Sequence, residues 1–179
     1  MRRCQRGFTL VELLVTLTVT VVLMGLAAPS FRTLLLKRAV QAAADALVDD
    51  LRLARSEAIK RSATVSICNS SDGASCSNGA GWETGWIVFV DTDGDGTLDA
   101  GEQILRVQDA LRSVASIASD NPASDRRFFV YQATGMARAS TQTFKITPVG
   151  ANGADLMRLV CVSMQGRAAL RARGSLSCA

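Results

Sequence analysis

The densest group of reactive side chains in this chain is an acidic segment of twelve residues, 91–102. Carboxylates stand at its first, third, fifth, ninth and twelfth positions, and a glycine stands at the sixth. Calcium prefers six to eight oxygen ligands, and the glycine allows the sharp turn that a twelve-residue calcium loop requires. The segment therefore predicts a calcium site with these ligands: Asp91, Asp93, Asp95, Thr97 through its carbonyl oxygen, Asp99 and Glu102.

A second interpretation of this segment needs no metal. β-Branched and aromatic residues precede it at 86–90 and follow it at 103–107, so it is expected to join two strands rather than two helices. Asp and Gly are common in such turns for conformational reasons of their own. The calcium loop and the solvated hairpin turn both stay open, and calcium is the one cofactor suggested, with none required.

Histidine is absent from the chain. Its absence excludes Ser-His-Asp and Cys-His catalysis and every metal site that uses imidazole. The best remaining catalytic candidates are the carboxylates of 91–102, but they crowd one hydrophilic turn rather than a pocket. We therefore expect no enzymatic activity and no catalytic residue.

A different carboxylate, Glu12, is the only charged side chain in the apolar run Phe8–Ala28. An ionised side chain at the depth of a lipid core costs roughly 2.5 to 3.5 kcal/mol, so a defined partner is expected. No basic residue within the run can supply one. The partner of Glu12 must come from a new chain terminus or from another molecule.

The residues before Glu12 suggest where that terminus arises. Three arginines precede the run, and Gly7-Phe8 followed by Glu12 resembles the type III signal of type IV pilins and type II secretion pseudopilins. The resemblance implies that prepilin peptidase cleaves between Gly7 and Phe8 and methylates the amine of Phe8. It also implies that Glu12 pairs with the amine of a neighbouring subunit during assembly. The alternative is an ordinary signal peptide cleaved near Ala28, or a lone anchor.

Four segments are needed to position these groups. We expect a leader over 1–7, a hydrophobic transmembrane and assembly helix over 8–28, an amphipathic helix half over 29–61 and a β-rich head over 62–179. Residues 8–28 are enough to cross a hydrocarbon core of about 30 Å. Pro29 should loosen the helix, and an apolar stripe from Ala39 to Ala58 should face the head.

Six strands are expected in the head, on an antiparallel sheet that packs against this helix in an α+β fold. They are Thr64–Cys68, Trp86–Val90, Gln103–Val107, Arg127–Gln132, Thr143–Thr147 and Leu159–Ser163.

The head most resembles the GspH/FimT group of minor pilins and pseudopilins. The segments that carry this resemblance are Arg55–Arg61, Gly85–Asp91 with the acidic Gly-rich turn after it, and Gly166-Arg167. It implies a type IV pilin-like subunit that is first held in the inner membrane with a periplasmic head and then joins other pilins in a filament. A minor pilin of a type IV pilus is the leading interpretation, and a minor pseudopilin of the type II secretion system is the alternative.

The C-terminal part of the chain is basic. Residues 156–179 contain Arg158, Arg167, Arg171 and Arg173 and no acidic residue. Some FimT-type pilins bind DNA through a Gly-Arg-x-Arg segment that Gly166-Arg167 resembles, although Ala169 stands where the second arginine belongs. On an extended strand Arg167, Arg171 and Arg173 would share one face and could contact phosphates of extracellular DNA. The alternative is a solvated strand face.

Overall charge does not support this DNA hypothesis, because the net charge of +4 falls to +1 once the three arginines of the leader are removed.

The cysteines indicate an oxidising compartment. Cys4 lies in the leader, which leaves an even set that predicts two disulfides outside the cytoplasm: Cys68, Cys76, Cys161 and Cys178. Three pairings are possible, and proximity in sequence favours Cys68 with Cys76 and Cys161 with Cys178.

Overall fold

The structure is a computed structural model that describes residues 8–77, 79, 81–120, 127–138, 141–150, 156–172, 174, 175, 177 and 178, without the side chains of 26–30. The expected leader, with Gly7, therefore lies outside the described residues. Two compact units are distinguished, Met1–Leu35 and Leu36–Ala179, and helix α1 (Leu10–Arg61) contributes to both. The helix continues through Pro29 without an interruption in its secondary structure.

The first unit is the beginning of α1, whose apolar side chains are exposed from Phe8 to Met24. Over the described residues, no helix combines the length and the apolarity that a membrane span requires.

The second unit begins with the half of α1 whose buried side chains follow helical spacing. Val40, Ala43, Leu47, Leu51 and Ala54 are almost completely buried. The stripe becomes one side of the main hydrophobic core.

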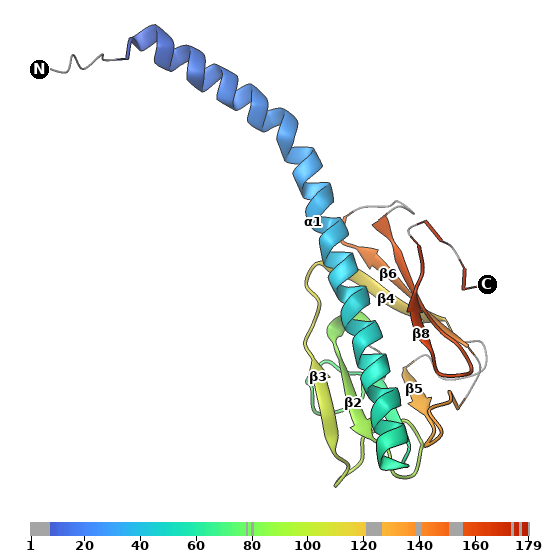
Figure 1. Cartoon of the computed structure of the whole chain (residues 1–179). Helices are drawn as coiled ribbons and strands as arrows, with labels where there is room; N and C mark the ends of the chain where they lie inside the picture. Colours follow the sequence, from blue (N-terminus) through green and yellow to red (C-terminus); the bar gives the residue numbers. More distant parts are fainter. Residues whose placement is uncertain are drawn as a thin grey trace, which may run out of the picture. The chain divides into compact units, whose positions relative to one another are not determined.

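The head contains two four-stranded antiparallel sheets rather than the single sheet expected from the sequence. The first has the order β3-β2-β1-β5, with β1 Val65–Asn69, β2 Trp86–Val90, β3 Ile104–Gln108 and β5 Phe128–Tyr131. The second has the order β4-β6-β7-β8, with β4 Val114–Asp120, β6 Gln142–Pro148, β7 Arg158–Val162 and β8 Ala168–Leu170. Strands of both sheets lie beside α1 in Figure 1. The α+β class is confirmed, β4 is the strand that sequence reasoning missed, and β8 is shorter than the extended basic strand expected around Arg167 and Arg171.

A short 3-10 helix, η1 (Trp82–Thr84), lies between β1 and β2 of the first sheet and contacts strands of the second sheet. The ring of Trp82 contacts Phe144 of β6 edge to face, with 5.0 Å between centroids. Oε2 of Glu83 accepts a hydrogen bond from the backbone N–H of Ile117 in β4 at 3.0 Å. An aromatic contact of this kind adds about 0.5 to 1.5 kcal/mol beyond the area it buries.

One buried carboxylate fixes α1 against the first sheet. Asp50 accepts hydrogen bonds from Nε1 of Trp86 at 2.8 Å and from Nε of Arg106 at 3.1 Å. Burial raises the pKa of Asp50, and the bonds from Trp86 and Arg106 partly oppose this effect. The interaction joins α1 to β2 and β3 and so restricts sliding of the helix along the sheet.

We expect Asp50→Ala to destabilise the head by about 2 to 4 kcal/mol, because it leaves the N–H of Trp86 buried without an acceptor. Urea unfolding of the detergent-solubilised chain, followed by tryptophan fluorescence, measures this change. The matched control is Asp49→Ala, because the side chain of Asp49 is 67% exposed and lies 3.6 Å from exposed Arg52. The effect of this control should stay within about 0.5 kcal/mol. Equal effects for the two variants would contradict an anchoring role.

The raised pKa of Asp50 also predicts a pH dependence. The folded state holds this proton to higher pH than the unfolded state does, so the protonated group favours folding below about pH 4. The free energy of unfolding of the wild type relative to Asp50→Asn should therefore fall as the pH rises through the folded-state pKa. A difference that grows with pH would mean that Arg106 stabilises the ionised form more than burial disfavours it.

Candidate functional site

The first candidate site is the start of α1, where Thr9 and Glu12 satisfy each other's backbone. The N–H of Glu12 donates to Oγ1 of Thr9 at 3.2 Å, and the N–H of Thr9 donates to Oε2 of Glu12 at 3.5 Å. This is a capping box, in which a threonine at the N-cap and a glutamate three residues later satisfy two N–H groups of the helix terminus. The spacing Thr-x-x-Glu was readable in the sequence, and sequence reasoning missed it because only the charge of Glu12 was considered.

Beyond this cap the helix presents apolar side chains all around. Phe8 is 81% exposed, and large apolar residues from Leu10 to Met24 are exposed with it. The threonines do not interrupt this surface, because their hydroxyls donate to backbone carbonyls of the preceding turn: Thr16 to Leu13 at 2.9 Å, Thr20 to Thr16 at 2.6 Å, and Thr18 to Leu14. An apolar surface of this extent marks a contact with other helices or with lipid.

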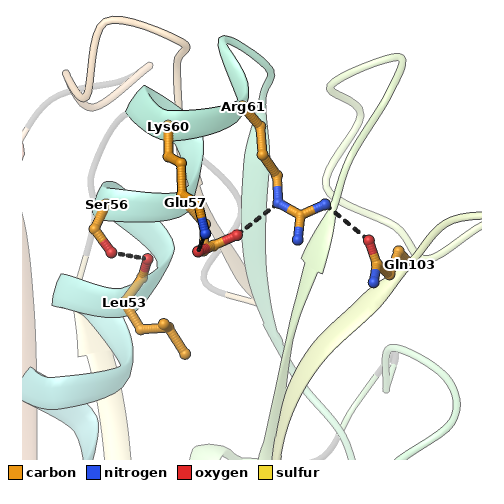
Figure 2. A network of polar contacts seen from close by, with 6 residues as sticks. All are labelled: Leu53, Ser56, Glu57, Lys60, Arg61 and Gln103. Atoms are coloured by element: carbon orange, nitrogen blue, oxygen red, sulfur yellow. Dashed lines mark hydrogen bonds and ion pairs between the residues drawn. The ribbon is translucent and has the colours of Figure 1, made fainter.

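The last turn of α1 forms a polar network that reaches the first sheet (Figure 2). Nε of Arg61 donates to Oε2 of Glu57 at 2.6 Å, and Nη1 of Arg61 donates to Oε1 of Gln103 at 2.8 Å. Lys60 lies 3.4 Å from the same carboxylate. The hydrogen bond from Arg61 is the main cause that lowers the pKa of Glu57. The network ties the end of the helix to the residue that directly follows the acidic loop.

The acidic loop 91–102 joins β2 to β3, as the sequence predicted, and its first carboxylate is buried. The oxygens of Asp91 accept hydrogen bonds from the N–H groups of Gly94 at 2.6 Å and Gly96 at 3.0 Å, and from Oγ of Ser66 in β1. Burial raises the pKa of Asp91 in spite of these bonds. Asp91 therefore organises the turn through backbone N–H groups of the loop itself.

Three of the expected calcium ligands come together. Carboxylate oxygens of Asp91, Asp93 and Asp95 all lie within 4.8 Å of one another. Oδ1 of Asp95 accepts hydrogen bonds from the backbone N–H and the hydroxyl of Thr97, which lower the pKa of Asp95. Asp91 is buried in this cluster, whereas Asp93 and Asp95 are exposed to solvent.

The remaining two carboxylates are arranged differently. Glu102 accepts hydrogen bonds from the backbone N–H groups of Thr92 at 2.6 Å and Asp99 at 3.0 Å. Desolvation and the nearby charges of Asp95, Asp93 and Glu102 raise the pKa of Asp99. The loop thus fits calcium in part: three converging carboxylates are present, while Glu102 serves the loop's own backbone. The calcium site stays a prediction.

Both expected disulfides are present, Cys68–Cys76 and Cys161–Cys178, each with Cα atoms 5.7 Å apart. This is the pairing that proximity in sequence favoured. Cys76 Sγ lies 3.7 Å from the carbonyl oxygen of Gly96. Leu98 packs in the same small cluster, so the acidic loop rests on the first disulfide. Closing each loop contributes about 2.5 to 3 kcal/mol in the chain-entropy model.

The structure separates the basic residues expected to bind DNA. Strand β8 covers only Ala168–Leu170, so Arg167 and Arg171 flank it instead of lying within a longer strand. Arg158 donates to Oε1 of Gln41 and to the carbonyl oxygen of Arg171, and Arg171 donates to the carbonyl oxygen of Cys178. Arg173 lies outside the described residues. Two of the four arginines therefore have partners within the head.

Arg167 and Arg171 nevertheless line one hollow beside β8, with a volume of about 620 Å³. A second hollow contains Arg167 together with Arg52 and Arg55 of α1. Sequence reasoning missed the two helix arginines, because their proximity to β8 arises only from the tertiary fold.

Comparisons with known proteins agree with this architecture. A model of the family described as type II transport protein GspH matches residues 43–166. The prokaryotic N-terminal methylation motif matches residues 2–28. The chain is 32% identical over 169 residues to the pilin-like protein PilA1 of Thermus thermophilus, which covers 93% of this chain and 98% of that protein.

Solved structures show the same fold. The type IV minor pilin FimU of Pseudomonas aeruginosa is 26% identical, with a TM-score of 0.60 over 78% of this chain and 95% of that chain. The minor pseudopilin EpsH of the Vibrio cholerae type II secretion system is 15% identical, with a TM-score of 0.51 over 74% of this chain and 96% of that chain, and shows similarity of fold alone.

If the acidic loop binds calcium, calorimetry should show a heat of calcium binding. The protein should also melt at a higher temperature with calcium than with chelator. A ligand at one hundred times its Kd stabilises by about 2.7 kcal/mol. Asp93→Asn with Asp95→Asn should abolish both effects. The control pair Asp109→Asn with Asp120→Asn, which removes the same charge from exposed positions outside the loop, should keep them. If the wild type gives no heat and melts identically in chelator, the loop is a solvated turn.

Proposed function

The chain belongs to the GspH family of pilin-like proteins, and we propose that it is a non-enzymatic minor pilin that enters a type IV pilus through the first half of α1. The observation that carries the proposal is the exposed apolar surface of residues 8–24. It is interrupted by the single charge of Glu12. In a filament of parallel helices, neighbouring subunits would cover this surface.

Processing supplies the partner that Glu12 lacks. Cleavage between Gly7 and Phe8 frees the amine of Phe8, directly before the capping box. Prepilin peptidase then methylates this amine. Within its own chain Glu12 uses Oε2 to cap Thr9. Oε1 of the same carboxylate can then accept a hydrogen bond from the charged amine of an adjoining subunit. Pairing of the two charges would offset the cost of keeping either in an apolar environment.

Before assembly, the same segment would hold the chain in the inner membrane with the head in the periplasm. Prepilin peptidase and other pilins are then the expected partners.

The second candidate function is that of a minor pseudopilin in a type II secretion system, which the match to the GspH family model favours. A deletion strain separates the two: loss of twitching or DNA uptake with normal secretion supports the pilus, and the reverse supports the pseudopilus.

We also propose that the head binds extracellular DNA. Support comes from Arg167 and Arg171, which line one hollow beside β8. The surrounding segment 156–172 contains no acidic residue. Among the described residues, the lining includes no aromatic side chain for base stacking, so the interaction would be with phosphates and would depend strongly on salt.

The charge-pair proposal predicts opposite effects for two substitutions at the start of α1. Glu12→Gln keeps a side chain that can cap the helix but removes the charge, so its incorporation into filaments should fall strongly. Thr9→Ala removes the cap at a cost of about 1 kcal/mol but leaves the charge, so its incorporation should persist. Immunoblots of sheared filaments, normalised to total cellular protein, measure both.

The reverse pattern, with Thr9→Ala excluded and Glu12→Gln incorporated, would mean that Glu12 matters only as a helix cap. That result would contradict the charge pair while leaving the fold untouched.

For DNA, Arg167→Gln should weaken binding about equally for unrelated sequences and make the slope of log affinity against log salt shallower by about 1. Fluorescence anisotropy with labelled duplexes measures both quantities. An unchanged affinity and slope would remove Arg167 from the site.

A further inference from the structure

A groove lies between the last turns of α1 and the turn that joins β7 to β8. It has a volume of about 450 Å³, and its helix wall carries Arg52, Arg55 and Ile59, while its other wall carries Gly166, Arg167 and Ala168. All of these residues belong to the same compact unit, Leu36–Ala179. We call this feature the helix–hairpin groove.

A close backbone contact holds the two walls together. Gly166 has a φ of +74°, and a Cβ atom there would lie 3.0 Å from Cε1 of Tyr131 and closer still to the carbonyl oxygen of Gly135. The same carbonyl oxygen accepts a hydrogen bond from Nε of Arg55 at 3.0 Å. Only glycine therefore lets the turn approach this closely, and the approach brings Arg167 alongside the helix arginines.

The arginines of the groove keep donors for a ligand. Arg55 uses Nε for Gly135, which leaves its two Nη groups as donors. Arg52 is 64% exposed and lies 3.6 Å from exposed Asp49, a pair worth at most about 1 kcal/mol that a stronger anion can replace. Arg52 and Arg55 are three residues apart, so they lie on one face of the helix.

The groove adjoins the hollow beside β8, because Arg167 and Ala168 line both. Among the described residues, neither lining includes a carboxylate. Four arginines, Arg52, Arg55, Arg167 and Arg171, thus line these two adjoining hollows. A chain of regularly spaced anions matches such a path better than a single small ion does.

We propose that the helix–hairpin groove binds the phosphate backbone of duplex DNA, with Arg52 and Arg55 of α1 as binding residues in addition to Arg167 and Arg171. The inference rests on the proposed DNA binding and changes its geometry: the duplex crosses from β8 onto the helix instead of following one strand. No aromatic residue in the described part of either lining offers a stacking platform, so the groove contacts phosphates and reads no sequence.

The test uses the full-length chain in detergent and a labelled duplex of random sequence, with anisotropy measured between 50 and 200 mM salt. Arg52→Gln with Arg55→Gln should lower the affinity about tenfold and make the salt slope shallower by about 1.8, because two phosphate contacts are lost. The control Arg112→Gln with Lys145→Gln removes the same charge from residues outside both linings. It should leave the slope unchanged.

Because Arg55 also bonds Gly135, Arg52→Glu keeps the test independent of folding. Its side chain is exposed, and the reversed charge should weaken binding at least as much as Arg52→Gln does. The inference is overturned if the helix variants behave like the control pair, including the case in which they bind DNA normally but no longer enter filaments. If Arg167→Gln weakens binding and the helix variants do not, only this inference fails. If the wild type binds no duplex, the proposed DNA binding fails as well.

Discussion

The rest of this structure depends on an apolar helical surface that the described part of the chain leaves uncovered. From Phe8 to Met24 the side chains of α1 are exposed, and the threonines among them turn their hydroxyls back to the helix. Such a surface is unstable in water and stable among other helices or lipid tails. One carboxylate, Glu12, is the only charge on this surface, and we propose that a neighbouring subunit pairs with it.

The second half of the same helix meets a different requirement. There the apolar residues form one stripe, and the two sheets bury it completely. Asp50 adds polar interactions with Trp86 and Arg106 to this hydrophobic contact. These interactions restrict the helix to one register against the sheet. Two disulfides close the loops of the head. The head is thereby stabilised by contacts of its own, so the exposed helix surface stays available for assembly.

Much of this organisation was predictable because it follows from local periodicity. The alternation and β-branched residues of Trp86–Val90 identified β2 with its observed bounds, and the apolar stripe identified the buried face of α1. Strand β4 was missed because it is rich in alanine and serine, and a register shift between Val114 and Ser116 breaks its alternation. The division into two sheets was missed as well, since it depends on which strands pair, and β1 pairs with β5 although more than 50 residues separate them in the sequence.

The candidate sites show the same limit. Spacing alone placed Asp91, Asp93 and Asp95 in one cluster, because they belong to a single turn. Spacing could not show that Arg158 is engaged by Gln41, a residue 117 positions away, or that Gly166 brings Arg167 to Arg55. Contacts between distant segments determine which arginines face a ligand, and one sequence carries little information about them.

We propose that processing creates an amine at Phe8, close to Glu12, the one charged residue of the assembly surface. Intact mass measurement and N-terminal peptide sequencing of the protein purified from filaments test it most directly. We expect a chain that begins at a monomethylated Phe8. A chain that begins at Met1, or one cleaved beyond Ala28 so that Glu12 is lost, would contradict it.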